Sequence, residues 1–311
     1  METFKKEDMV LGTWGEITCL GKENICRRSL EKAFNEIRNL EKILSFFHPE
    51  SEVTLINRAQ GKPVKVRKET FEVVKKAKEI SQKTDGAFDI TVAPLLEIWG
   101  FYDREKRVSP SSELVKKTLS SIGEDKIILS EDKGTITLNN PATKIDLGGI
   151  AKGYIVDRAI ISLQNDGIKN ALVNIGGDIF VLGEKNFRNP WQVGIQDPED
   201  KEKIILTLRL KNKAIATSGQ YENFRGFSGK KLGHIIDPRT GYPVENEILS
   251  VTVVASDCLT ADALATAIFV LGKEKAPALL KEFCADAIII TKTKKGKHIW
   301  ISKGLKNKVF Y

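Results

Sequence analysis

The strongest constraint on the fold is a long run of short strand patterns that contains a single helical segment. Between residues 126 and 255, stretches rich in β-branched and aliphatic residues alternate with turn residues. One helical pattern, from Ala151 to Asn165, interrupts them. The predicted strands are Lys126–Leu129, Thr135–Asn139, Lys144–Leu147, Ala171–Ile175, Ile179–Gly183, Trp191–Gln196, Ile204–Leu210, Ala214–Thr217 and Leu249–Ala255. Adjacent strands joined by short turns pair in antiparallel fashion.

Amphipathic helices are predicted before and after this run. From Asn24 to Phe47, apolar residues recur at helical spacing. The other predicted elements are a strand at Gly12–Leu20, helices at Lys68–Thr84, Ser111–Ile122, Ala261–Leu271 and Ala276–Phe283, and a hairpin of Ala287–Ile290 and His298–Ile301 around Lys294–Gly296. This mixed order favours an α+β fold with largely antiparallel sheets and packed helices over a doubly wound parallel sheet. The 311 residues predict a single domain over 1–311, with two intimate subdomains as the alternative.

The chain is basic, with a formal net charge of +8. A basic balance can favour anionic partners. However, the Lys and Arg residues are spread along the chain, so a solvated basic surface is the simpler interpretation. Nucleic acid is not an expected partner, because the sequence holds no recognised nucleic-acid-binding module or aromatic–basic motif.

The cellular compartment stays open at the level of sequence. No apolar run is long enough to span a membrane, and the polar segment Met1–Val10 does not read as a signal peptide. We therefore expect either a cytoplasmic protein or an exported or membrane-anchored mature form whose signal was removed. The four cysteines form no C-x-x-C pair and only three histidines are present, so a structural zinc site is not expected.

Two segments could contact a phosphate-containing ligand, although the chain lacks the G-x-G-x-x-G and G-x-x-x-x-G-K-[ST] motifs. In Lys144–Tyr154, a glycine-rich turn leads into a helix. The free N–H groups at a helix start bind phosphates, but a tight strand–helix turn explains the same residues. In Asp85–Thr91, Asp89 and the backbone amides could touch a ligand, or the segment is only a helix stop and a turn.

Two further segments carry polar residues that could take part in chemistry. His234 precedes the well-formed turn Asp237–Gly241, and a structural histidine is the alternative to a catalytic one. Thr260 can cap a helix on which Asp262 and Thr266 lie four residues apart on one face. Such hard oxygen ligands suit Mg²⁺, although an acid near a helix start also stabilises the helix dipole.

Taken together, these segments resemble the ApbE family of FAD:protein FMN transferases. The resemblance runs from about Leu11 to Gly272, and the matching blocks follow the family order. The blocks are Leu11–Trp14, Ser45–Asn57, Gly86–Asp89 with Pro94–Leu95 and Trp99–Phe101, Asp146–Tyr154, Asn174–Asp178, Ala216–Gly219, His234–Pro238 with Thr240–Gly241, and Ala261–Thr266.

The resemblance implies a site for FAD and Mg²⁺. The implied FAD contacts are Leu11, Phe47, Ala87, Phe88, Asp89, Asp146, Lys152, His234 and Ile236. The implied Mg²⁺ ligands are Asp262, Thr266 and the backbone carbonyl of Gly149. The chain departs from the family at two positions. Leu11 stands where the family often has Met, and Ala265 stands where some members place an acidic ligand, so water or phosphate oxygens would complete the metal shell.

The activity implied by the resemblance is transfer of the FMN half of FAD to a Ser or Thr hydroxyl of a target protein, with release of AMP. His234 is the first candidate for the general base and Asp237 is the second. The expected acceptor carries a short Ser/Thr-containing motif, as in membrane redox subunits. Two alternatives remain open: hydrolysis of FAD to FMN and AMP at the same site, and FAD binding without turnover.

Overall fold

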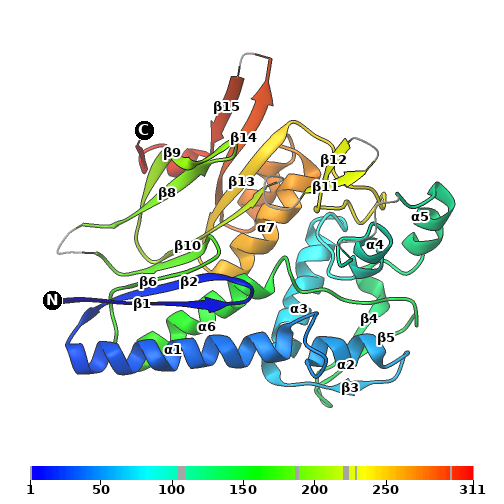
Figure 1. Cartoon of the computed structure of the whole chain (residues 1–311), viewed down its shortest axis with the longest axis horizontal. Coiled ribbons are helices and arrows are strands. Elements are labelled where there is room, and N and C mark those ends of the chain that lie inside the picture. Colours follow the sequence, from blue (N-terminus) through cyan, green and yellow to red (C-terminus); the bar gives the residue numbers. More distant parts are fainter. Residues whose placement is uncertain are drawn as a thin grey trace.

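An antiparallel sheet forms the centre of the protein (Figure 1). The computed structural model describes residues 2–103, 109–185, 189–219, 224–227, 230–294 and 296–310. Over these residues the central sheet has eight strands, and each strand is antiparallel to its neighbours. In spatial order they are β1 (Glu2–Val10), β2 (Thr13–Gly21), β6 (Ala171–Ile175), β7 (Asp178–Leu182), β10 (Lys213–Gly219), β13 (Ile248–Ala255), β14 (Asp286–Thr293) and β15 (Gly296–Ile301).

The burial of each strand follows its place in the sheet. The inner strand β13 is buried along most of its length, because both faces of the sheet are covered, and its sequence is accordingly almost continuously apolar. The edge strand β1 is largely exposed and carries charged residues such as Lys5 and Glu7, which disfavour pairing with other chains. The sequence prediction missed β1 because its polar composition hides the alternation.

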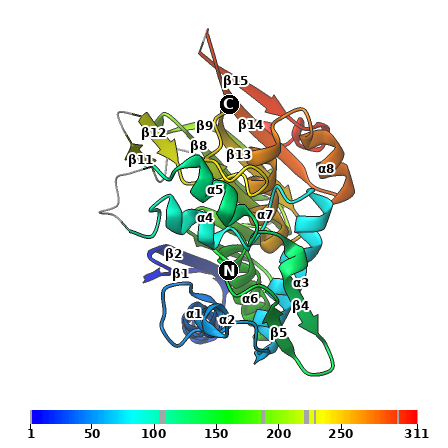
Figure 2. The ribbon, with the colours of Figure 1, turned by 90° about the vertical axis from the view of Figure 1, so that its right-hand side faces the viewer.

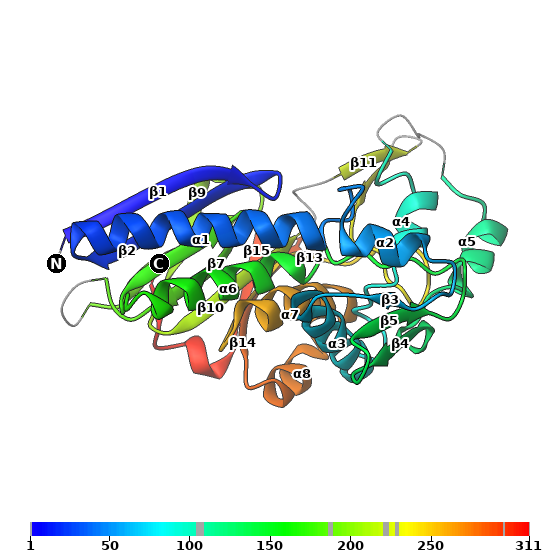
Figure 3. The same cartoon turned by 90° about the horizontal axis from the view of Figure 1, so that it is seen from below.

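Helices cover one face of the sheet (Figure 3). They are α1 (Glu23–Leu44), α6 (Ala151–Asn165) and α7 (Cys258–Leu271), and α3 (Lys68–Lys83) packs beside α1 and α7. Phe34 and Phe269 lie fully buried in the apolar core between these helices and the sheet. Helix α6 passes very close to the start of α7 at Gly153, where an added Cβ would lie 2.3 Å from the carbonyl oxygen of Cys258. Only glycine permits this approach, which brings neighbouring residues of the two helices together.

A smaller sheet covers the opposite face. It consists of β8 (Trp191–Asp197), β9 (Asp200–Leu210) and β16 (Val309–Phe310). Trp191 and Leu208 from this sheet pack against Val181 and Ile288 of the central sheet and form a second core. Among the described residues, no helix is both long enough and apolar enough to cross a bilayer.

Most of the remaining elements lie beside one end of the helical layer (Figures 1 and 2). They are α2 (Glu52–Arg58), α4 (Ala93–Ile98), α5 (Ser112–Leu119), α8 (Ala276–Glu282), a sheet of β3 (Val64–Lys65), β5 (Thr135–Leu138) and β4 (Ile127–Ser130), a hairpin of β11 (Phe224–Phe227) and β12 (Lys230–Gly233), and the 3₁₀ turn η1 (Glu124–Lys126). The 3₁₀ turn η2 (Lys303–Leu305) instead follows β15, and its Leu305 belongs to the second core. A third apolar cluster joins α4 and α5 to Ile236, which follows β12.

The structure confirms the predicted α+β class and most predicted elements, but it corrects three details. The segment Lys144–Leu147 is not a strand and makes only an isolated bridge to Val92. The side chain of Asn57 occupies the backbone N–H and C=O of Ile145, at 2.7 and 2.9 Å, so these groups are not available to a strand partner. The predicted helix Asn24–Phe47 ends at Leu44.

The third correction concerns the start of α7. Asp257, not Thr260, caps this helix, and its carboxylate accepts the Thr260 N–H at 2.8 Å. The final hairpin is confirmed as β14 and β15, although Lys295 in its predicted turn lies outside the described residues. The assignment of residues 1–311 to one domain stays a prediction.

Candidate active site

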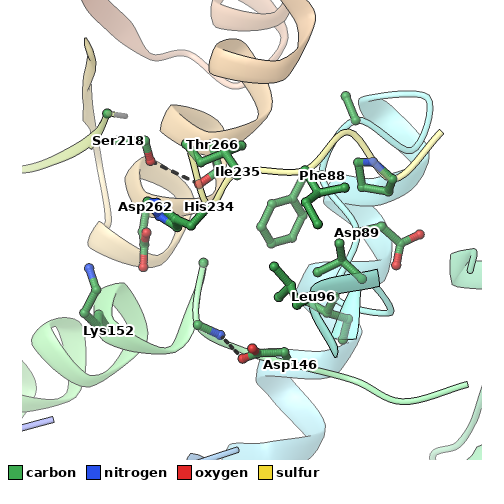
Figure 4. Close-up of a pocket in the computed structure, with 18 of the residues that line it drawn as sticks. Phe88, Asp89, Leu96, Asp146, Lys152, Ser218, His234, Ile235, Asp262 and Thr266 are labelled. Atoms are coloured by element: carbon green, nitrogen blue, oxygen red, sulfur yellow. Dashed lines mark hydrogen bonds between the residues drawn. The ribbon is translucent and has the colours of Figure 1, made fainter. Parts of the chain in front are cut away.

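A pocket of about 330 Å³ opens where α7, β10, the start of α6, the α3–α4 loop and the segment after β12 meet (Figure 4). The described residues that line it are Ala87, Phe88, Asp89, Ile90, Val92, Leu96, Asp146, Gly148, Gly149, Lys152, Thr217, Ser218, Gly219, His234, Ile235, Ile236, Pro238, Asp262 and Thr266. The four sequence segments singled out for chemistry therefore converge on one cavity. Every predicted site residue lines it except Leu11, Phe47 and Asp237.

One end of the pocket presents oxygen atoms from α7 and its neighbours. Asp262 and Thr266 lie one helical turn apart on α7. The hydroxyl of Ser218, on β10, lies 3.1 Å from that of Thr266. Gly149 faces the same point, since a Cβ placed on it would lie 3.7 Å from the Thr266 hydroxyl and 3.3 Å from the Phe88 ring. Two separate segments, α7 and β10, thus direct hydroxyl and carboxylate oxygens into this space, and the backbone of Gly149 lies beside them.

Charged groups surround this end. Lys152 projects from the first turn of α6 and pairs with Asp178, which is almost fully buried at the start of β7. Burial, followed by repulsion from the Asp178 carboxylate, raises the pKa of Asp262 to about 7. Burial acts to lower the pKa of Lys152, but the Asp178 and Asp262 carboxylates outweigh it and raise that pKa above its ordinary value. Asp178 lies in the block Asn174–Asp178, where nothing in the sequence alone marks it as the partner of Lys152.

The donor set fits a hard divalent cation. A carboxylate at Asp262, a hydroxyl at Thr266 and the nearby backbone of Gly149 are the kinds of oxygen ligand that Mg²⁺ takes. The described residues contain no cluster of three or more His, Cys, Asp or Glu side chains that could enclose a metal. A cation here would therefore complete its shell with water or ligand oxygens, as Mg²⁺ does at substrate phosphates.

The opposite end of the pocket is apolar. Phe88 points into the cavity and faces the α7 residues, and Leu96 lies beside it (Figure 4). The Asp89 side chain also has partners within the protein, because its carboxylate accepts hydrogen bonds from Ser81 and from the N–H and hydroxyl of Thr91 at 2.7 to 3.0 Å. Burial raises the pKa of Asp89, although these hydrogen bonds oppose the effect. Asp89 thus holds the wall in place.

Asp146 lies in this wall and has two donors of its own. It accepts the Gly148 N–H at 2.8 Å and the hydroxyl of Tyr102. Tyr102 is stacked on Phe46, with ring centres 4.3 Å apart, and Phe47 lies edge-on to both rings. The Phe47 side chain is 74% exposed. Phe47 is therefore connected to the pocket through Tyr102 and Asp146, two contacts that the sequence did not reveal.

The two candidate bases differ in position. His234 lines the pocket and lies on the same side as Asp262 and Thr266 (Figure 4). Asp237 is outside the lining, and both its oxygens accept hydrogen bonds from the Arg239 guanidinium at 2.7 and 2.8 Å. Its carboxylate stabilises the turn, so the geometry favours His234.

Leu11 occupies the turn between β1 and β2. It adopts a left-handed backbone with φ of 51°, as does Gly12 with φ of 68°, which is typical of a two-residue hairpin turn. Its N–H donates to Glu41 near the end of α1 at 2.9 Å. Leu11 therefore joins the hairpin to α1 and lies outside the pocket lining.

Known proteins are similar to this chain in both sequence and fold. A sequence model described as the ApbE family matches residues 11–289. The chain is 36% identical, over 268 residues, to an FAD:protein FMN transferase of Klebsiella pneumoniae, covering 85% of this chain and 82% of that protein. It is 33% identical over 282 residues to the FAD:protein FMN transferase of Escherichia coli K12, covering 89% and 80% of the two chains.

Solved structures agree with the sequence comparison. The ApbE protein of Thermotoga maritima superposes with a TM-score of 0.89 at 34% identity and covers 97% of this chain and 98% of its own. The flavin transferase ApbE of Vibrio cholerae gives a TM-score of 0.88 at 30% identity and covers 99% of each chain. With its sequence, its fold and the convergence of its motifs on one pocket in agreement, the chain belongs to the ApbE family.

Proposed function

We propose that the protein transfers the FMN part of FAD to a Ser or Thr hydroxyl of a target protein, with Mg²⁺ as cofactor and AMP as the second product. Family membership makes the chain a transferase that uses FAD. The observation that carries the finer proposal is the joining, in one cavity, of an oxygen donor set, a lysine and an apolar wall. Such a pocket matches a ligand that combines a diphosphate with flat aromatic rings.

The residues divide the work by their chemistry. Lys152 brings a positive charge to the diphosphate end of the pocket, and Asp178 holds its ammonium in place. Asp262, Thr266 and the Gly149 carbonyl would hold Mg²⁺, which when bound neutralises charge on the diphosphate. Phe88 offers an aromatic face to a ring of FAD at the opposite end.

The reaction is an in-line displacement at phosphorus. The oxygen of the acceptor hydroxyl forms a bond to the phosphorus next to riboflavin, and the bond from that phosphorus to the bridging oxygen breaks. AMP leaves with the bridging oxygen. His234 takes the proton of the hydroxyl, because it is the candidate base that lines the pocket.

The acceptor is a protein with a short Ser/Thr-containing segment, and we propose a membrane redox subunit as its source. Two other activities would use the same pocket. Water in place of the hydroxyl gives FAD hydrolysis to FMN and AMP, and a protein without turnover would only bind FAD. The pairing of Asp262 with Thr266 favours turnover over storage, because mere storage does not require a cation at the diphosphate.

The test is incubation of the purified protein with FAD and Mg²⁺, with and without an acceptor peptide, followed by AMP measurement and mass spectrometry. We expect AMP and an FMN-sized mass gain on the peptide, both lost in Asp262→Ala and retained in Asp200→Ala, a control on the distant strand β9. AMP without a labelled peptide would indicate the hydrolase. Bound FAD without AMP would indicate the binding protein and overturn the proposal.

A further inference from the structure

Tyr102 connects the rings of Phe46 and Phe47 to the pocket. It follows α4, and its hydroxyl donates to Asp146, 44 positions away along the chain. Its ring is stacked on Phe46 at 4.3 Å with an angle of 23° between the planes. The ring contacts and the hydrogen bond fix both the plane and the tip of the side chain.

This contact determines how the Asp146 carboxylate is presented. One oxygen accepts the Gly148 N–H at 2.8 Å, and the other accepts the Tyr102 hydroxyl. Two donors on different oxygens hold the carboxylate in one rotamer, and each oxygen keeps a second lone pair. Asp146 lines the pocket, so these lone pairs are placed for a hydrogen-bond donor of a bound molecule.

Loss of the tyrosine hydroxyl would leave the half-buried Asp146 carboxylate with one hydrogen-bond donor fewer. A carboxylate removed from water depends on the donors that the protein supplies, and hydrogen bonds to charged groups are the stronger ones. Without the phenol, Asp146 would keep the Gly148 N–H but could turn toward other partners. A ligand would then have to fix the carboxylate before it could bind.

We propose that Tyr102 is a positioning residue for FAD: it holds the Asp146 carboxylate in the orientation that accepts an N–H or O–H donor of FAD. This inference rests on the proposed function, because it takes FAD as the ligand of the pocket. Tyr102 acts through Asp146 and has no part in the displacement at phosphorus. Its contribution therefore lies in substrate affinity and not in the rate of the bound complex.

The experiment compares Tyr102→Phe with the unchanged protein. The ring stack survives this substitution and only the hydroxyl is lost. We expect the Kd of FAD, titrated by flavin fluorescence with Mg²⁺ and no acceptor, to rise about tenfold, as the loss of a hydrogen bond to a charged group predicts. KM for FAD should rise in parallel while kcat at saturating FAD stays unchanged.

The matched control is Tyr154→Phe. The Tyr154 hydroxyl also donates to a carboxylate, that of Glu72 at 3.0 Å, but it does not line the pocket. This variant loses the same kind of hydrogen bond and should bind FAD as the unchanged protein does. If both variants lost FAD affinity equally, the effect would reflect general stability and the proposal would be overturned.

A double-mutant cycle shows whether Tyr102 acts through Asp146. In an Asp146→Ala background, adding Tyr102→Phe should change the Kd of FAD by less than about twofold, because each substitution alone already removes the Tyr102–Asp146 hydrogen bond. An undiminished tenfold loss in that background would refute the positioning role, as would an unchanged Kd in Tyr102→Phe alone. If the unchanged protein bound FAD but released no AMP, the proposed function would fail while this comparison would still decide the role of Tyr102.

Discussion

Two buried carboxylates in the wall of the same pocket differ in their neighbours: one is surrounded by neutral hydrogen-bond donors and the other by charged groups. Asp89, at the apolar end, accepts three hydrogen bonds from neutral groups of Ser81 and Thr91. Asp262, at the polar end, accepts the Gly153 N–H at 3.2 Å and otherwise faces other charges. Protein groups supply the hydrogen bonds that the Asp89 carboxylate needs, whereas the Asp262 carboxylate has few such donors and remains available to a cation.

The neighbours of each carboxylate explain the difference. Asp262 shares its surroundings with Asp178 and Lys152, so two carboxylates face one ammonium among the described side chains at this end. This surplus of negative charge is unfavourable in a buried place unless a cation enters. A residue that stabilises the fold and a residue that awaits a ligand can therefore be distinguished by their partners, although both are buried aspartates.

The comparison predicts its largest effect at Asp262. Asp262→Asn should lower kcat/KM about a hundredfold or more, since a bound metal supplies several kcal/mol of charge stabilisation. The melting temperature of the metal-free protein should not fall, because the repulsion between Asp262 and Asp178 is removed. Calorimetric titration with Mg²⁺ in the presence of FAD, together with thermal melting, would measure both quantities. A large fall in melting temperature with unchanged Mg²⁺ affinity would place Asp262 in the same class as Asp89.

The second effect tests how the polar end is assembled. Gly153→Ala would place a Cβ 2.3 Å from the Cys258 carbonyl oxygen and force α6 and α7 apart. We expect the free energy of unfolding to fall by about 3 kcal/mol, as overpacking of a close helix contact predicts. Chemical denaturation would measure it, with Ser162→Ala on the same helix as control. Equal stability of the two variants would mean that the helices yield easily at this contact.

The sequence predicted the periodic and the glycine-marked parts of the molecule. Helix Ala151–Asn165 was predicted with its observed bounds, because its apolar positions recur at helical spacing and Asp166–Gly167 follows its end. The pocket segments were found because Gly, Asp and Thr are concentrated in them beyond the needs of a core. These signals are local, so they can be recognised without knowledge of the tertiary structure.

The parts that the sequence did not reveal depend on contacts between distant segments. Asp178 gains its role from Lys152, 26 positions earlier, and Tyr102 gains its role from Asp146. The hydrogen bonds that tie Asp89 to Thr91 and Asp237 to Arg239 were not predicted either, because a residue type alone does not show which partners it has in the fold. A residue type states what chemistry is possible, and its neighbours decide which chemistry occurs.

The third effect lies at the other end of the pocket. Asp89→Ala would leave the hydroxyl of Ser81 and the N–H and hydroxyl of Thr91 without their acceptor. We expect the free energy of unfolding to fall by about 2 kcal/mol, the cost of buried donors left unsatisfied. Denaturant titration of this variant beside Asp262→Ala would show the contrast directly. If Asp89→Ala were fully stable yet inactive, Asp89 would have to contact the substrate.

The same contrast predicts a dependence of stability on pH in the metal-free protein. The pKa of Asp262 is about 7 in the folded protein, and that of an unfolded aspartate is about 3.9. Because the folded value is the higher one, the stability associated with protonated Asp262 is present below pH 4 and is lost as the pH rises through 7. Asp262→Asn should lack this loss, so its melting temperature should exceed that of the unchanged protein by a few degrees at pH 8 but not at pH 4.

The complementary measurement is the melting temperature in the presence of Mg²⁺. A cation bound at Asp262 would compensate the charge of the ionised carboxylate, so addition of Mg²⁺ at pH 8 should recover the stability of the unchanged protein and leave Asp262→Asn unaffected. Melting temperatures of the unchanged protein and of Asp262→Asn, measured at pH 4 and pH 8 with EDTA and with Mg²⁺, would test both expectations. Parallel pH profiles of melting temperature for the two proteins in EDTA would mean that the Lys152 ammonium already compensates the charge of Asp262 in full. The carboxylate of Asp262 would then be as well stabilised by the protein as that of Asp89.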